Sequence, residues 1–228
     1  MVTMSKNLYN TLMFIFNKWH SYFYINLIIL VRVLNMRKCL RDALFILFIF
    51  HLTPIASAEE PRINLRSSYN TLSVPQVQSI LNVPIHSKEE WGFFGHSTIN
   101  HNYKLKSISE DKVVVDNATG LMWHQSGSDK NMSWIGVKNW IRSLNSRGYG
   151  GYHDWRLPTV EEAASLLESG KSNDLYIDSV FDSKQPGIWT GDKHVSGSAW
   201  YVNFKGNGSV YWEDKYNSDF VRTVRSVE

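Results

Sequence analysis

The block YGGYHDWRLPTVEE, residues 149–162, constrains the fold most, because it marks the end of a strand and the start of a helix. Pro158 has no N–H to donate to a β-ladder and therefore ends an extended segment. Thr159, followed three residues later by Glu162, has the pattern of a capping box, which closes the first turn of a helix. Glu161 and Glu162 also place negative charge at the positive end of that helix. The block therefore predicts a strand that turns directly into a helix.

Alternation along the extended part gives its other side chains structural roles. Neighbouring side chains of a strand point to opposite faces, so His153 and Asp154 diverge and do not form a local relay. Asp154 and Arg156 share one face and are expected to pair, whereas Trp155 and Leu157 share the other and are expected in the core. We therefore assign this whole set to the construction of the fold: Asp154, Trp155, Arg156, Leu157, Pro158, Thr159 and Glu162.

The segments around this block predict a domain of the α+β class. Residues 112–123 have a hairpin pattern with Gly120 at the turn. Apolar residues at helical spacing predict a helix that Ser133 caps and Gly148 ends, and a second helix is expected over residues 160–168. Strands, two helices and further strands in this order indicate two helices packed on small antiparallel sheets. The later strand patterns cover residues 188–190, 199–204, 209–214 and 220–227, with the tight turn Gly206-Asn207-Gly208 before the third.

The N-terminal part has the features of an export signal. Residues 36–58 contain a basic start, the apolar run ALFILFIF and Ala56-Ser57-Ala58 before an expected cut. Residues 1–35 are an upstream extension if translation starts at Met36, and a membrane-associated segment or hairpin otherwise. We expect an exported protein, in the periplasm, at the cell surface or secreted. The alternative is a protein anchored in the membrane through uncleaved N-terminal apolar segments.

The rest of the chain divides into a weakly patterned lead-in segment, residues 59–109, and a patterned domain, residues 110–228. Of 24 Lys and Arg and 21 Asp and Glu, 6 and 1 precede Glu59, which leaves 18 basic and 20 acidic residues without a block of like charge. Nucleic acid is not an expected partner, because its phosphates require clustered Lys and Arg. Cys39, the only cysteine, lies in the leader, so the exported chain would have no disulfide and no thiolate metal site.

Several short motifs follow one another in a fixed order through residues 112–227. They are Val115-Asp116, Thr119-Gly120-Leu121-Met122-Trp123, Gly151-Tyr152, Asp154-Trp155-Arg156-Leu157-Pro158-Thr159, Trp189-Thr190, Ala199-Trp200 and Val221-Arg222-x-Val224-Arg225. This ordered set resembles the Lcl C-terminal domain family, formerly a domain of unknown function and named for a collagen-like adhesin. The resemblance implies a C-type-lectin-like fold, related to that of formylglycine-generating enzymes, with its N- and C-terminal strands adjacent. We therefore expect residues 113–115 to pair with residues 221–227.

The leader, the resemblance to an adhesin domain and the eight tryptophans after Ala58 indicate an exported, non-catalytic binding module. Its expected ligand is a glycan or another surface polymer, because sugars place their C–H faces on exposed aromatic rings beside polar groups. Trp200 shares a face with Val202 and Phe204 and is expected in the core. A surface protein is the alternative partner. The candidate binding residues lie on or beside the C-terminal strands: Trp189, Asp192, His194, Tyr211, Trp212, Glu213 and Asp214.

An enzyme is the alternative function, either an iron-dependent oxidase or one of formylglycine-generating type. Formylglycine-generating enzymes use a cysteine pair, which the exported chain would lack, and the related iron oxidases use two histidines with a carboxylate. We expect no metal and no cofactor, because these histidines lack ligand spacing: His96, His101, His124, His153 and His194. Residues 185–187 and 212–214 resemble parts of calcium-dependent lectins at a different spacing, which leaves calcium dependence open.

Overall fold

The computed structural model describes residues 23, 24, 26 and 62–227. By its internal contacts the chain divides into two compact units, Met1–Ala58 and Glu59–Glu228, and every element named below belongs to the second. The predicted signal peptide, the proposed start at Met36 and its cleavage point lie outside the described residues. Among the residues that are described, no helix is long and apolar enough to cross a membrane.

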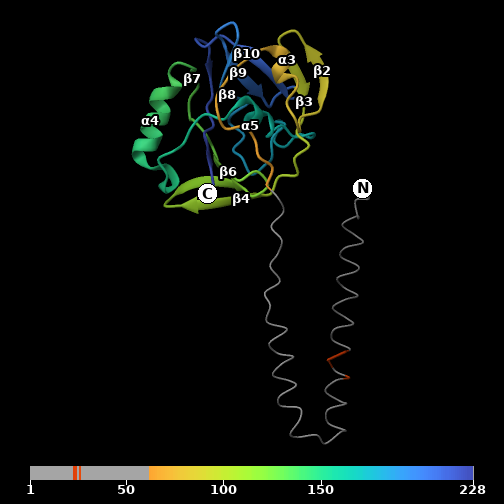
Figure 1. Ribbon diagram of the computed structural model, residues 1–228. Helices are drawn as coiled ribbons and strands as arrows, with labels where there is room; N and C mark the ends of the chain where they lie inside the picture. Colours follow the sequence, from red (N-terminus) through yellow and green to blue (C-terminus); the bar gives the residue numbers. More distant parts are fainter. Residues whose placement is uncertain (1–22, 25, 27–61, 228) are drawn as a thin grey trace, which may run out of the picture. The chain divides into compact units, whose positions relative to one another are not determined.

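The larger sheet has six strands in the order β1-β8-β9-β10-β3-β2 (Figure 1). Its neighbouring strands are antiparallel, except that β1 pairs parallel with β8. The predicted turn at Gly206 and Gly208 is confirmed, since both have a left-handed backbone, with φ of 64° and 65°. The strands are β1 (Thr71–Leu72), β2 (Ile85–Glu89), β3 (Gly92–Gly95), β8 (Gly187–His194), β9 (Ala199–Asn203) and β10 (Ser209–Glu213).

A second sheet has four strands in the order β12-β6-β5-β4, and β7 and β11 form a separate pair. The predicted hairpin is confirmed as β5 and β6, with Asp116 opposite Leu121. The expected pairing of residues 113–115 with residues 221–227 is wrong, because β4 and β6 occupy both edges of β5 and β12 pairs with β6 instead. These strands are β4 (Tyr103–Ile108), β5 (Asp111–Asp116), β6 (Leu121–His124), β7 (Met132–Ser133), β11 (Ser218–Asp219) and β12 (Val224–Ser226).

The lead-in segment supplies parts of both sheets. Its strands β1, β2 and β3 belong to the larger sheet, and β4 forms an edge of the smaller one. Between β1 and β2 lies the short helix α3 (Val74–Val77), with Pro75 in its first turn. Residues 62–109 are therefore built into the same compact unit as the patterned domain.

Two further helices differ from the prediction at their ends. Helix α4 (Val137–Arg147) begins after Gly136, and Ser133 is not its cap, because Ser133 pairs with Ser218 in the β7–β11 ladder. Its predicted end is confirmed by Gly148, which has φ of 70°. Helix α5 (Val160–Ala164) is shorter than predicted, and Leu166 and Leu167 follow it in turns that bond three residues back.

The block at 149–162 has the predicted helix start, but the strand predicted before it is reduced to a single bridge residue, Arg156, and the ion pairs differ from the prediction. Thr159 Oγ1 accepts from the N–H of Glu162 at 3.1 Å, and Glu162 Oε2 accepts from the N–H of Thr159 at 2.8 Å, so the capping box is confirmed. Trp155 and Leu157 are buried as predicted. The expected pair between Asp154 and Arg156 is wrong. It assumed the alternation of a strand, whereas only Arg156 forms a β-bridge here, to Val224. Arg156 binds Glu162 at 2.7 Å, and Asp154 binds Arg225 at 2.7 Å.

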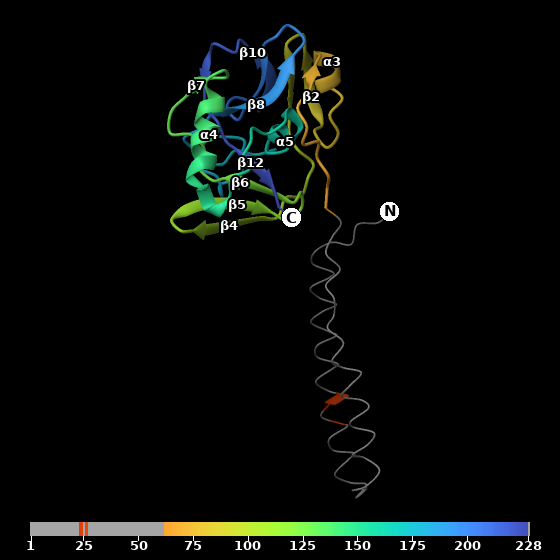
Figure 2. The same ribbon diagram turned by 60° about the vertical axis from the view of Figure 1, so that its left-hand side comes forward.

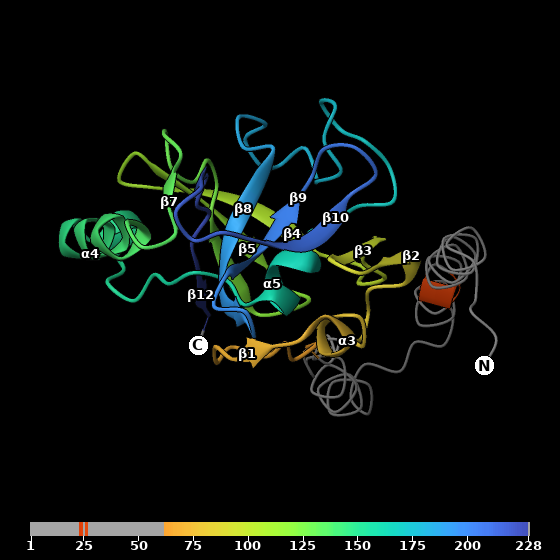
Figure 3. The same ribbon diagram turned by 90° about the horizontal axis from the view of Figure 1, so that it is seen from above.

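The main core lies between the two sheets, with α5 at its centre (Figures 1 and 2). Val160 and Ala163 of α5 pack there with Trp123 of the smaller sheet and Trp200 of the larger one. Trp200 is fully buried, as its alternation with Val202 predicted. Seen from above, α4 lies at one side of the domain and β2 at the other (Figure 3). The result is a mostly-sheet α+β fold with few helices.

Candidate functional site

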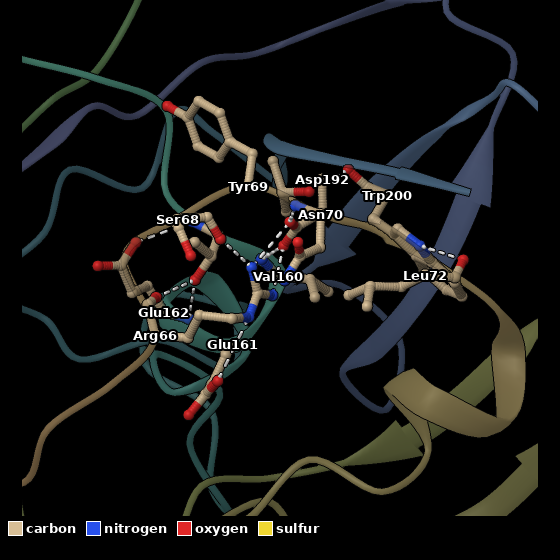
Figure 4. A network of polar contacts seen from close by, with 12 residues as sticks. Arg66, Ser68, Tyr69, Asn70, Leu72, Val160, Glu161, Glu162, Asp192 and Trp200 are labelled. Atoms are coloured by element: carbon tan, nitrogen blue, oxygen red, sulfur yellow. Dashed lines mark hydrogen bonds and ion pairs between the residues drawn. The ribbon is translucent and has the colours of Figure 1, made fainter. Parts of the chain in front are cut away.

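The Asp192 carboxylate is the centre of a buried polar network (Figure 4). Arg66 donates to both of its oxygens, at 2.9 Å and 2.7 Å, and the backbone N–H groups of Asn70 and Val160 donate at 2.6 Å and 2.7 Å. Because Asp192 is fully buried and its oxygens are already bound by four donors, it holds the fold together. Its predicted role in binding a ligand is therefore corrected.

This network fixes the segment at residues 66–71 against the rest of the domain. Thr159 Oγ1 donates to the carbonyl of Arg66 at 2.8 Å, and Tyr69 Oη donates to the carbonyl of Leu157 at 2.9 Å. The Tyr69 ring lies so close to Gly191 that a Cβ at that glycine would be 2.1 Å from a ring carbon. The segment therefore has one position, with the Tyr69 ring against β8.

A groove of about 850 Å³ lies beside this segment. It is lined by residues 69–71 of the segment, by the start of α4 with the residues before it, by residues 155–157 and by the end of β8. Its exposed side chains include Tyr69 and Ile135, which keep 47% and 50% of their surface accessible. The groove is larger than two other concavities in the described part of the chain, which have volumes of about 380 and 330 Å³, and this makes it the first candidate for a ligand site.

Aromatic and cationic side chains occur together in the groove. The Trp134 indole is fixed by a hydrogen bond of 2.7 Å from Nε1 to the carbonyl of Thr190, and Lys193 Nζ lies 5.6 Å from the centre of its ring. Lys138 also lines the groove. Within the described part of the chain, neither Lys138 nor Lys193 has an ion pair with an acidic side chain. The groove therefore offers a flat ring and two uncompensated positive charges.

Trp189 does not reach the surface. It is fully buried, its Nε1 donates to the carbonyl of Met132 at 3.0 Å, and its ring packs edge-on against Tyr201. The prediction that Trp189 binds a ligand is corrected, because β8 is covered at this point by the β7 segment. Trp189 and Asp192 are therefore structural residues of β8, although the sequence pattern also allowed both to be exposed.

His194 and Trp212 are brought together but lie outside the groove. Their rings stack with centroids 4.8 Å apart and planes 7° apart, and His194 Nδ1 lies 2.8 Å from Ser196 Oγ. Burial lowers the pKa of His194. The Trp212 Nε1 atom is buried and has no hydrogen-bond partner among the described residues.

Tyr211, Glu213 and Asp214 lie along β10 and its end, also outside the groove. The half-buried Tyr211 ring contacts Trp91 edge-on at 5.7 Å, and burial raises its pKa to about 12. Burial also raises the pKa of Asp219 to about 7, and the neighbouring Glu213 carboxyl adds to this effect. Asp214 is exposed and accepts from the N–H of Tyr216 at 2.9 Å. The predicted candidates therefore occupy two kinds of position: buried positions of β8, and half-buried or exposed positions of β10 and the residue after it.

The groove residues were not among the sequence candidates. Trp134 falls within the helix that the sequence predicts after Ser133, and Tyr69 lies in the lead-in segment, which has little pattern. Lys193 is the single exposed position of β8, but the sequence does not distinguish it, because Asp192 and His194 on either side of it are also polar and are buried.

His101, His124 and Gln185 have structural partners. His101 lies between Asp116 Oδ2 and the carbonyl of Ser165, both at 2.7 Å, and His124 Nδ1 accepts from the N–H of Gly127. The fully buried Gln185 donates to the carbonyl of Ser128 at 2.9 Å. Across residues 62–227, no three His, Cys, Asp or Glu side chains come close enough to hold a metal ion together.

The fold and the groove together define a small, mostly-sheet α+β domain with an open aromatic and cationic surface site. The family model of the Lcl C-terminal domain matches residues 112–225, half of the chain, and the chain belongs to this family. The matched residues run from β5 to β12, so β1 to β4, together with Tyr69, lie outside the match. No curated protein and no solved structure matches the chain.

Proposed function

We propose that this protein is an exported, non-catalytic binding module that holds a polysaccharide or another surface polymer in the groove beside α4. Membership of a family named for a collagen-like adhesin supports a role at the cell surface. The observation that carries the proposal is that Trp134, Lys138 and Lys193 line one groove, with Lys193 Nζ 5.6 Å from the centre of the Trp134 ring, and that neither lysine has an acidic partner in the described chain. An enzyme is not proposed.

The chemistry of the groove suits a chain of sugars with acidic groups. A sugar ring places its C–H face on an indole and gains contact area without losing a hydrogen bond. A carboxylate or sulfate on the same polymer would neutralise Lys138 and Lys193, and such pairing at a solvated surface acts mainly on specificity and on the rate of association. An open groove also accepts the middle of a long chain, which a closed pocket does not.

A protein partner is the second candidate, and Ile135 favours it. A half-exposed isoleucine at the edge of a groove beside the exposed Tyr69 ring is typical of the apolar centre of a protein interface. A pulldown with the purified protein distinguishes the two candidates, because glycan binding survives protease treatment of the target surface and protein binding does not.

Binding to an array of glycans tests the main proposal. The double substitution Lys138→Glu and Lys193→Glu reverses both charges of the groove and should remove binding. The matched control is Lys104→Glu with Lys106→Glu, which makes the same change of net charge on exposed residues of β4. Absence of binding by the unaltered protein, or equal loss in both double variants, would refute the proposal.

The finer fold and the location are also proposed. The C-type-lectin-like fold is supported by the family and by β12 lying in one sheet with β5 and β6, and an experimental structure compared with known lectins tests it. Export is supported by the leader sequence, and the N-terminal residue of the exported protein tests it. A first residue of Glu59 is expected for a cleaved signal peptide, and Met1 or Met36 for an uncleaved anchor.

A further inference from the structure

One face of the Tyr69 ring lies flat on strand β8. A Cβ placed on Gly191 would be 2.1, 2.4 and 2.5 Å from three neighbouring ring carbons, Cε1, Cδ1 and Cζ. Such similar distances are expected for an atom above the face of the ring, because an atom beside the ring edge lies markedly closer to one carbon than to its two neighbours. The backbone of Gly191 therefore covers this face, and only a glycine leaves room for such a close approach.

The opposite face of the Tyr69 ring is open to the groove beside α4. Tyr69 keeps 47% of its surface accessible and lines this groove. Its ring extends away from the ion pairs around Asp192 (Figure 4). Because Gly191 covers one face, the accessible part of the ring is its other face and its edge. Tyr69 therefore presents a flat aromatic surface to a ligand in the groove.

Two hydrogen bonds fix the Tyr69 ring before any ligand binds. Its Oη atom donates to the carbonyl of Leu157 at 2.9 Å, and the backbone N–H of Asn70, the next residue, donates to the buried Asp192 carboxylate at 2.6 Å. Strand β1 of the larger sheet begins directly after Asn70 and pairs with β8. A side chain that is already held in its bound position loses little conformational entropy on binding. The ring is therefore preorganised for stacking.

Trp134 provides a second fixed ring beside the same stretch of β8. Its Nε1 atom donates to the carbonyl of Thr190, the residue before Gly191, and Lys193 Nζ lies 5.6 Å from the centre of its ring. The side chains of Tyr69 and Trp134 therefore contact adjacent residues of one strand and line one groove. A polysaccharide repeats the apolar C–H face of a sugar along its length, so one chain can cover two such rings.

We propose, on the basis of the function proposed above, that Tyr69 is a second stacking position, so that the groove binds a chain of two or more sugar residues more tightly than a single sugar. Trp134 and the two lysines bind one residue of the chain through its ring and its acidic group, and Tyr69 covers the C–H face of another. Tyr69 precedes residues 112–225, which match the family. The preference for a chain therefore depends on a segment outside the family domain.

Titration of the full chain with galacturonate and its oligomers of two to six residues, followed by NMR, tests the proposal. Every residue of these probes has a pyranose ring and a carboxylate. We expect the affinity of the unaltered protein to rise with oligomer length until both rings are covered. Tyr69→Ala should weaken binding of the hexamer by about threefold to tenfold. It should leave binding of the monomer unchanged, because the monomer binds at Trp134 and the lysines.

Two further substitutions separate stacking on the ligand from packing of the segment. Tyr69→Phe keeps the flat ring on Gly191 and should retain most of the affinity for the hexamer. Tyr69→Leu keeps an apolar side chain but has no flat ring, and it should weaken hexamer binding as much as Tyr69→Ala does. The matched control is Tyr216→Ala, which removes an exposed tyrosine that does not line the groove and should leave the affinity for every oligomer unchanged.

The dependence on oligomer length decides between the outcomes. Equal weakening of monomer and hexamer binding by Tyr69→Ala, or full affinity in Tyr69→Leu, would overturn the proposal. Hexamer binding that Lys138→Glu with Lys193→Glu removes and Tyr69→Ala leaves unchanged would overturn it as well, but would keep the proposed function of the groove. Absence of binding to every oligomer by the unaltered protein would contradict both.

Discussion

Arg66 and Asp192, which are 126 residues apart in the chain, form a two-pronged ion pair with N–O distances of 2.9 Å and 2.7 Å. This pair attaches the segment before β1 to the end of β8, and Tyr69 follows three residues after Arg66. The part of the groove lining that residues 69–71 supply therefore depends on a contact between the family domain and a segment that precedes it.

Arg66→Ala should lower the free energy of unfolding by about 2 kcal/mol or more, because it leaves the buried Asp192 carboxylate with only two backbone donors. Urea denaturation measures the change. The control is Lys184→Ala, which removes an exposed pair with Asp182 at 3.8 Å and should change stability by less than about 1 kcal/mol. Equal effects of the two substitutions would show that the network does not stabilise the domain.

Gly191→Ala should destabilise the protein by about 1–3 kcal/mol through its contact with Tyr69. The added Cβ would lie 2.1 Å from the Tyr69 ring, so the ring must leave its place. If this is the cause, Tyr69→Ala should relieve most of the added loss. A double-mutant cycle measures the coupling between the two positions, and additive effects would contradict the prediction.

Acidification should remove the stability that Asp116 contributes. Burial alone would raise the pKa of this carboxyl, but hydrogen bonds from His101 and Thr119 outweigh it and lower the pKa below the ordinary 3.8. A lowered folded-state pKa means that the contribution is complete above about pH 4 and is lost as pH falls through the folded-state pKa. Unfolding free energies of the unaltered protein and of Asp116→Asn should therefore converge only below about pH 4. A constant difference between them down to about pH 2 would contradict this assignment.

Thr159→Ala should lower stability by about 1–2 kcal/mol, since it removes the cap of α5 and the hydrogen bond to the carbonyl of Arg66. Ser133→Ala is the informative comparison. The sequence pattern makes Ser133 a helix cap, whereas the structure places it in β7, so its replacement should change stability by less than half as much. A larger loss at Ser133 would restore the sequence-based assignment. Thermal or urea unfolding of both variants measures the two losses of stability.

The sequence by itself determined the features that depend on neighbours in the chain. The capping box at Thr159 and Glu162, the inward faces of Trp155 and Leu157 and the turn at Gly206 and Gly208 follow from local hydrogen bonding, alternation and the freedom of glycine at positive φ. These features required no knowledge of what lies opposite. Placing the candidate ligand residues of β8 and β10 did require this knowledge, because alternation separates the two faces of a strand without showing which face is covered by the rest of the protein.

Only the tertiary structure decided the long-range partners. Asp154 binds Arg225 and not Arg156, and β12 pairs with β6 and not with β5. The groove likewise forms from a segment before β1, the start of α4 and the end of β8. Each of these contacts joins residues far apart in the chain or depends on strand register. Local residue preferences do not encode such contacts, because their free energy comes from packing and charge pairing in the folded state.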